Sequence, residues 1–200
     1  MDADGLTFAC ATSAEERVAR RLGLDAVRVG VCVANGVPEG RLVSFGLAGS
    51  LAGMRIGDVL DATRVVDETG ATLWEGPGLG VRGARGGVVL GARDGVVLGG
   101  DVLVHDPVAR ARLREASGAD AVDMESGVLA RSGRLAGVIR AISDDSGSAV
   151  EGVDRTVHVD GRTNVVGLIR WVATRRGNAV RSMRDAVHAL HALEEAVATS

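Results

Sequence analysis

Acidic residues end two short apolar runs in the middle of the chain. Asp123 and Glu125 end the run that begins at residue 119, and Asp144 and Asp145 end the run that begins at residue 135. Ligands of an α/β sheet bind outside the carboxyl ends of its strands. If both runs are strands, we therefore expect these carboxylates to lie around one ligand-binding crevice.

Several carboxyl groups around one crevice suit the cleavage of a glycosidic bond. One carboxyl group donates a proton to the leaving group and another activates water. The transition state resembles an oxocarbenium ion, so negative groups near the sugar also stabilise it. The structural alternative is that Asp123 and Asp144 cap helices and that Glu125 pairs with an arginine such as Arg140. The residues alone leave both interpretations open.

Glu15 is a third candidate acid. Residues 6–11 are short and apolar and predict a strand, which a helical pattern follows. Ser13 and Glu16 match the S-x-x-E capping box, in which each side chain bonds the other residue's backbone N–H. This assignment leaves Glu15 free for chemistry. The alternative is a solvent-exposed first-turn carboxylate that the helix dipole favours.

Apolar runs bounded by turn residues predict the other strands. Residues 46–50, Gly-Leu-Ala-Gly-Ser, predict a glycine-rich loop at a strand end, which would let backbone approach a ligand. They match neither the dinucleotide fingerprint nor the phosphate loop. A turn at residues 68–70 predicts a β-hairpin. The predicted strands are residues 6–11, 26–34, 41–45, 57–66, 71–74, 88–90, 96–98, 119–124 and 135–143.

Three further segments predict helices. Residues 106–118 carry an Asp-Pro start and a glycine stop, and residues 162–176 and 178–198 have the longest helical patterns. His188 and His191 lie three residues apart in the last helix, but no third ligand is visible, so we assign no metal site. The segment between residues 146 and 161 predicts a loop over the site.

Composition limits the classes of function. The 200 residues, 46% of them apolar, suit a single α/β domain over residues 1–200. A net charge of -3 and 2% aromatic residues disfavour a nucleic-acid partner. The sequence predicts no transmembrane segment and no signal peptide. Cys10 and Cys32 have no metal-binding or redox spacing, so we expect a cytoplasmic protein.

Three blocks of sequence together resemble one enzyme family. They are Ser-Phe-Gly-Leu-Ala-Gly at 44–49 with Gly-Asp-Val at 57–59, Val-Asp-Met-Glu-Ser at 122–126, and Arg-Ala-Ile-Ser-Asp at 140–144. In this order they resemble the superfamily of nucleoside phosphorylases and methylthioadenosine/S-adenosylhomocysteine nucleosidases, over about residues 5 to 175. The resemblance implies a three-layer α/β/α domain with a mixed, partly barrel-like central sheet.

The resemblance also implies roles for the acidic residues. Asp144 would protonate N7 of a departing purine, and Glu125 would hydrogen-bond the ribosyl hydroxyls. Met124 would pack against the sugar, and Glu15 would position the attacking water. The implied substrate is a purine nucleoside, with no metal and no organic cofactor.

Further substrate contacts are implied on the strands and loops around these acids. Leu103 would pack on the purine, and the backbone of Val104 would bind its edge. The remaining implied substrate-binding residues are Asp123, Gly46, Leu47 and Ser143.

Departures from the family pattern favour water over phosphate as the nucleophile. Phosphorylases of the superfamily place an arginine just before the glycine loop and a hydroxyl within it, where this chain has Ser44 and Leu47. A phosphate would lose a charge-assisted partner there. Arg28, Arg41 or Arg82 would have to compensate, so phosphorolysis stays the alternative.

The chain is also short between Val33 and Arg41, where it has no room for the helix usual in the family. We expect a more open site that admits a bulky 5'-substituent. Short members of this kind are associated with hopanoid biosynthesis, in which adenine is removed from an adenosylated lipid. The family resemblance implies a homodimer. A third possibility is a degenerate homologue that binds nucleosides without cleaving them.

Overall fold

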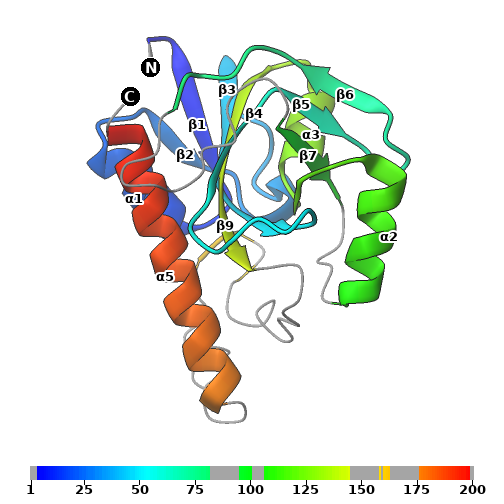
Figure 1. Ribbon diagram of the computed structural model, residues 1–200. Helices are drawn as coiled ribbons and strands as arrows, with labels where there is room; N and C mark the ends of the chain where they lie inside the picture. The colour runs from blue at the N-terminus through cyan, green and yellow to red at the C-terminus, as the bar shows by residue number, and fades with distance from the viewer. Residues whose placement is uncertain are drawn as a thin grey trace.

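The computed structural model describes residues 4–81, 95–100, 106–144, 158, 160–162 and 176–198, with the side chains of the last helix from residue 181 onward. Strands and helices alternate along much of the chain (Figure 1). The strands are β1 (Leu6–Cys10), β2 (Ala26–Arg28), β3 (Arg41–Ser50), β4 (Val59–Ala62), β5 (Arg64–Val66), β6 (Thr72–Glu75), β7 (Val96–Gly99), β8 (Ala121–Asp123) and β9 (Leu135–Asp144). The helices are α1 (Ser13–Arg21), the 3-10 turn η1 (Val31–Val33), α2 (Pro107–Ser117), α3 (Ser126–Arg131) and α5 (Arg176–Ala198).

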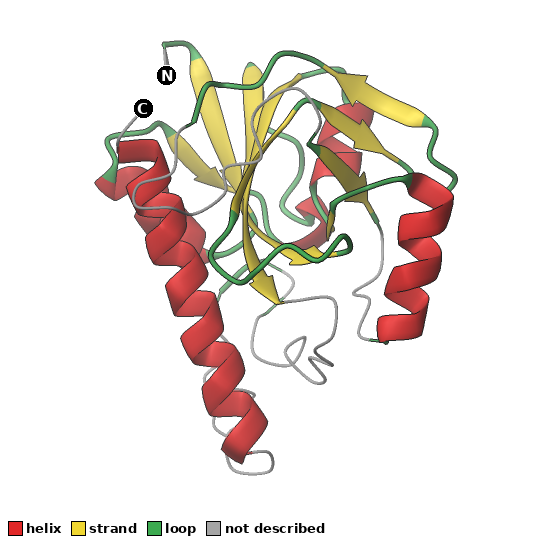
Figure 2. Ribbon diagram, in the orientation of Figure 1, coloured by secondary structure: helices red, strands yellow, loops and turns green. Residues whose placement is uncertain are grey.

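Strand β3 is the centre of a mixed sheet. It pairs in parallel with β1 and β9, and antiparallel with β8 at Gly49 and Ser50. Strand β9 also pairs antiparallel with β4, and the rest of the sheet runs in the order β2-β1-β3-β8-β7-β5-β6. Because β3 has three partner strands, the sheet branches there and curves around its centre (Figure 2).

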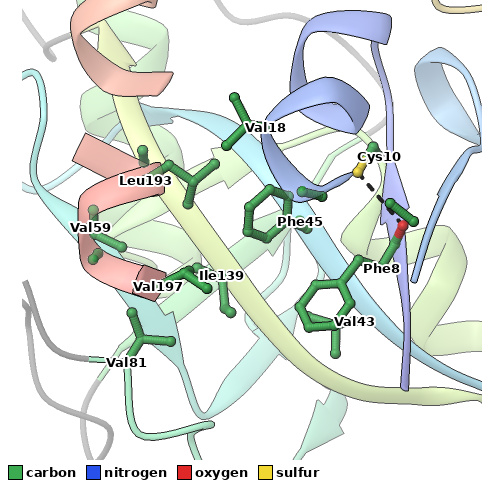
Figure 3. Close-up of a cluster of buried hydrophobic side chains, with 14 of the residues drawn as sticks. Phe8, Cys10, Val18, Val43, Phe45, Val59, Val81, Ile139, Leu193 and Val197 are labelled. Atoms are coloured by element: carbon green, nitrogen blue, oxygen red, sulfur yellow. Dashed lines mark hydrogen bonds between the residues drawn. The ribbon is translucent and has the colours of Figure 1, made fainter. Parts of the chain in front are cut away.

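Helices cover both faces of this sheet. On one face, α1 and α5 pack on a core that includes Phe8, Phe45 and Leu193, with the two phenylalanine rings edge to face at 5.7 Å (Figure 3). On the other face, α3 contributes Leu129 to a second core. Alternate side chains of β1, β3 and β9 point to the two cores, as the two-residue period of a strand requires. The predicted three-layer α/β/α fold with a mixed central sheet is confirmed.

Most predicted elements are found, with three corrections. The strand predicted over residues 57–66 is two strands, because β4 pairs with β9 whereas β5 pairs with β6 and β7. The strand predicted over residues 26–34 ends at Arg28, because Gly30, Cys32 and Val33 have positive φ angles that turn the chain into η1. The glycine-rich loop predicted over residues 46–50 is wrong, because these residues continue β3 and are hydrogen-bonded to β8 and β9.

The hairpin prediction is confirmed by antiparallel pairing of β5 with β6. Helix α2 begins at the predicted Asp106 cap and ends at Gly118, which is left-handed at φ 69. Helix α5 confirms the pattern predicted for residues 178–198. The predicted strand 88–90 and helix 162–176, and most of the predicted loop 146–161, lie outside the described residues.

The described residues were also compared with what a membrane-spanning helix and a metal site require. No helix in the described part of the chain combines the length and apolar character that a membrane crossing needs. Within the same residues, no three or more His, Cys, Asp or Glu side chains gather as a metal site would require.

Candidate active site

Glu15 is buried at the start of α1, where it is 3% exposed. Its Oε2 accepts hydrogen bonds from the Thr12 backbone N at 2.7 Å and the Thr12 hydroxyl at 2.9 Å, and its Oε1 accepts one from the Leu47 backbone N at 2.8 Å. The capping box predicted for Ser13 and Glu16 is wrong, because Thr12 caps the helix and Glu15 completes the box. Glu15 therefore joins α1 to β3.

Gly46 gives Glu15 the room to reach β3. A Cβ atom at Gly46 would lie 2.2 Å from Oε1 of Glu15 and 2.8 Å from Nη1 of Arg140. Both atoms come from other elements, so any side chain at residue 46 would displace one of them. The glycine that the sequence assigned to a loop is needed inside the strand.

Arg140 lies fully buried at the middle of β9, where β9 pairs with Gly46 of β3. Its Nε is 2.5 Å from Oδ2 of Asp123, and its Nη2 donates to the Ser44 hydroxyl at 2.6 Å. Burial alone would lower the pKa of Arg140, but Asp123, Glu125 and Glu15 outweigh it and raise that pKa above its usual value. We call Glu15, Asp123, Glu125 and Arg140 the Arg140 cluster.

Asp123 ends β8 and fixes the start of α3. Its Oδ1 accepts hydrogen bonds from the backbone N of Glu125 at 3.2 Å and of Ser126 at 2.9 Å, and its Oδ2 accepts one from the Ser126 hydroxyl. The Ser44 and Ser126 hydroxyl oxygens lie 3.0 Å apart, within hydrogen-bond distance. The structural alternative for Asp123 is thus confirmed in part, because this carboxylate holds a helix start as well as Arg140.

Glu125 is buried in the cluster and has a raised proton affinity. It is 5% exposed, with Oε2 3.5 Å from Nη2 of Arg140 and Oε1 accepting from the Cys32 backbone N at 3.2 Å. Burial raises the pKa of Glu125 to about 8; Arg140 opposes this shift, and the charges of Asp123 and Glu15 add to it. Glu125 therefore holds its proton near neutral pH.

Asp144 stands apart from the cluster, at the end of β9. Its Oδ2 is paired with Nη2 of Arg110, a buried arginine on α2, and its Oδ1 accepts from the Ser143 hydroxyl at 3.2 Å. Its side chain keeps 18% exposure. The residues that follow Asp144 lie outside the described part of the chain, so the helix-capping alternative for Asp144 stays open. We call these two residues the Asp144–Arg110 pair.

Strand β3 relates the two groups in space. Arg140 pairs with Gly46 and Asp144 pairs with Gly49, three residues farther along β3. At about 3.3 Å per residue, the two groups are about 10 Å apart along the strand. A Cβ at Gly49 would lie 3.1 Å from Asp144 Oδ2, so this glycine also makes room for a carboxylate.

The other residues predicted for the site divide into three sets. Met124 and Leu47 are half-buried next to the cluster, and the Leu47 carbonyl accepts from Arg140 Nη1 at 3.4 Å. Ser143 is half-buried beside Asp144. Leu103 and Val104 lie outside the described residues.

Four contributors were not predicted from the sequence. Thr12 has a signal, because Thr12-x-x-Glu15 matches the capping pattern as well as Ser13-x-x-Glu16 does. The hydroxyl of Ser126 has a local signal too, since Asp123-x-x-Ser126 is a capping spacing. The backbone N of Cys32 and the guanidinium of Arg110 have none, because each reaches the site through a contact between distant segments.

A hollow elsewhere on the surface is separate from both groups. It has a volume of about 510 Å³ between α1 and α5. No residue of the Arg140 cluster or of the Asp144–Arg110 pair lines it.

Comparison with known families decides the affiliation of the chain. The model of the phosphorylase superfamily matches residues 9–170, which include both acidic groups. The chain belongs to this superfamily. The family predicted from the three sequence blocks is therefore confirmed. No curated protein matches the chain.

Solved structures share the fold of this superfamily member at low identity. A mutant of the Helicobacter pylori methylthioadenosine nucleosidase with 5'-methylthioadenosine in its active site has a TM-score of 0.50 and 16% identity, covering 92% of this chain and 97% of that one. The futalosine hydrolase of H. pylori has a TM-score of 0.51 and 15% identity over 92% and 97% of the two chains. The Campylobacter jejuni 5'-methylthioadenosine/S-adenosylhomocysteine nucleosidase has a TM-score of 0.50 and 17% identity over 95% and 98%.

Proposed function

We propose that the protein is a nucleosidase that hydrolyses the N-glycosidic bond of a 5'-substituted adenosine and releases adenine. One observation carries the proposal: a buried cluster of three carboxyl groups and a separate carboxylate lie about 10 Å apart along one strand pair. This spacing lets one group act on the sugar and the other on the base. Nucleosidases of similar fold support the choice of reaction.

The Arg140 cluster suits the ribosyl half of the substrate. Three carboxyl groups share one guanidinium, so the cluster carries an excess of negative charge that favours a developing oxocarbenium ion. Glu15 takes the proton of a water molecule as its oxygen attacks C1'. Glu125, protonated near neutral pH, can both donate to and accept from the ribosyl hydroxyls.

Asp144 suits the base half. Asp144, which is paired with Arg110, first takes up a proton from solvent. As the C1'–N9 bond breaks, its electron pair passes to the purine, and this proton moves from the Asp144 carboxyl group to N7. Adenine then leaves neutral, and Asp144 is left as a carboxylate. Protonation by a positioned acid typically contributes about 10²- to 10⁴-fold to the rate.

The surroundings of Ser44 support water rather than phosphate as the nucleophile. The Ser44 hydroxyl is fully buried between Arg140 and Ser126. Arg140 is already shared among carboxylates, so it offers no spare charge to a phosphate dianion. The acidic excess would repel such an ion.

The finer substrate is an adenosine with a bulky 5'-group, such as an adenosylated hopanoid lipid. The chain between η1 and β3 forms no helix, which agrees with the short linker predicted from the sequence. We propose that this short linker leaves room for the 5'-group. A homodimer and a cytoplasmic location stay predictions.

The test is turnover of 5'-methylthioadenosine in H₂¹⁸O without phosphate. A nucleosidase releases adenine and places ¹⁸O on C1' of the sugar. Addition of phosphate should neither raise the rate nor yield a ribosyl 1-phosphate. Adenine release that depends on phosphate would establish the phosphorylase instead, and binding of the nucleoside without turnover would establish a degenerate homologue.

A further inference from the structure

Within the described part of the chain, Asp144 is paired with Arg110, which comes from a separate element, α2. Arg110 lies one turn into the helix that Asp106 and Pro107 start, and it is 2% exposed. Its Nη1 is 3.5 Å from the Ser50 carbonyl oxygen, and its Nη2 is paired with Oδ2 of Asp144. The guanidinium therefore joins the end of β3 to the end of β9.

Gly49 leaves room for this pair next to the backbone of β3. A Cβ at Gly49 would lie 3.1 and 3.3 Å from the two carboxyl oxygens of Asp144 and 3.5 Å from Nη2 of Arg110. The carboxylate and the guanidinium therefore both lie against the backbone of Gly49. Among the described residues, Ser143 donates a hydrogen bond to Oδ1 of Asp144, and a carboxylate oxygen has capacity for a second.

We propose that Arg110 is a positioning residue for protonation of the leaving base. It restrains one oxygen of Asp144, so that the other stays in a fixed place from which it can serve N7. This inference rests on the proposed function, because it requires Asp144 to be the acid. A purely structural role for Arg110, joining α2 to the sheet, is the alternative that the experiment has to separate.

The separating readout is the dependence of the rate on the leaving group. The adenine of 5'-methylthioadenosine needs a proton in order to leave. In the 4-nitrophenyl riboside of the same 5'-methylthio sugar, the leaving group is 4-nitrophenolate, which is a stable anion and needs no proton. The ratio of the two kcat values within one protein sample is independent of the fraction that is folded. Loss of structure lowers both rates, and loss of proton donation lowers the first alone.

We expect Arg110→Met to lower kcat for methylthioadenosine about 10- to 100-fold, as misplacement of a catalytic group does, and to change the nitrophenyl riboside rate less than about 3-fold. Arg110→Lys should restore part of the loss, because it keeps the charge. Arg112→Met, an exposed arginine on the same helix, is the matched control and should leave both rates unchanged.

A double-mutant cycle with Asp144→Asn completes the test. If Arg110 acts through Asp144, adding Arg110→Met to Asp144→Asn should cost no more than about 3-fold beyond Asp144→Asn alone. Equal losses on both substrates, or losses that multiply in the double variant, would overturn the role of Arg110 and leave the proposed function standing. An Asp144→Asn variant with the wild-type rate of adenine release would overturn the proposed function itself.

Discussion

The Arg140 cluster and the Asp144–Arg110 pair stabilise their carboxylates with different partners. In the cluster, Asp123 and Glu125 pair with the Arg140 guanidinium. Glu15 and Glu125 also accept hydrogen bonds from the backbone N–H groups of Thr12, Leu47 and Cys32. In the pair, one carboxylate meets one guanidinium at a strand end and keeps 18% exposure. The cluster therefore carries more negative than positive charge, whereas in the pair one negative charge meets one positive charge.

This difference matches the charges that arise when a nucleoside is cleaved. The sugar becomes positive, so an acidic excess stabilises it, whereas the departing base needs a proton and not a negative field. The same difference makes the cluster more costly to disturb, because its members have little solvent to replace a lost partner. Substitutions in matched positions of the two groups should therefore differ in size.

The largest difference in stability is expected between the two arginines. Arg140→Met leaves three buried carboxyl groups without their cation and should cost about 3 to 5 kcal/mol of unfolding free energy. Arg110→Met leaves one carboxylate that water reaches in part and should cost about 1 to 3 kcal/mol. Urea denaturation followed by circular dichroism measures both, and equal costs would remove the proposed distinction between the groups.

The two glycines of β3 provide a second matched comparison. Gly46→Ala places a Cβ 2.2 Å from Glu15 Oε1, so it should destabilise the protein by about 1 to 3 kcal/mol. Gly49→Ala meets Asp144 at 3.1 Å, where a small shift suffices, and should cost less than about 1 kcal/mol. Thermal unfolding of both variants measures these costs. A larger loss of stability in Gly49→Ala than in Gly46→Ala would contradict the distances given above. Gly53→Ala controls for glycine replacement in open space, although its φ of +74 adds strain of its own.

Two serines test the polar contacts of each group. Ser44→Ala removes an acceptor from Arg140 and a hydrogen-bond partner from Ser126 in a fully buried place, and should cost about 1 to 2 kcal/mol. Ser143→Ala removes one half-buried hydrogen bond to Asp144 and should cost about 0.5 to 1 kcal/mol. The midpoints of urea unfolding curves measure these costs. A larger cost for Ser143→Ala than for Ser44→Ala would show that the buried hydrogen bonds of Ser44 contribute little to stability.

The effect of Glu125→Gln should be smallest at acidic pH and grow toward alkaline pH. The pKa of Glu125 is about 8 in the folded protein and near 4.5 when unfolded, so the folded state binds the extra proton between these values. The wild-type protein should therefore lose stability as pH rises through this window, and Glu125→Gln should lose less. Melting temperatures at about pH 5, 6.5 and 8 test this, with exposed Glu75→Gln as control. A difference that stays constant with pH would refute the shift.

The strand ends that carry the acids could be predicted from the sequence, because apolar runs stop at Asp123 and Asp144 in β8 and β9. The helix start at Asp106 has an equally local signal. Glu15 was predicted as a candidate acid, but its burial and its place in the capping box could not be predicted in this way. Thr12 and Ser13 both offer a capping box, and the choice depends on where β1 ends and on the distant Leu47 backbone.

The glycines and Arg110 show a second limit. Gly46 and Gly49 have the composition of a loop, yet pairing with β8 and β9 keeps them in a strand, where they make room for carboxylates of other elements. Arg110 alternates with Arg112 and Arg114 along one helix, and no local pattern marks the first as the buried one. Such roles arise from tertiary contacts alone.

The most direct test of the whole account is the rate of adenine release by Asp144→Asn. Methylthioadenosine at saturating concentration should be cleaved about 10³-fold more slowly than by the wild-type protein, while its dissociation constant changes less than about 5-fold. An unchanged rate, or a loss explained entirely by weaker binding, would contradict the assignment of Asp144 as the acid that releases the base.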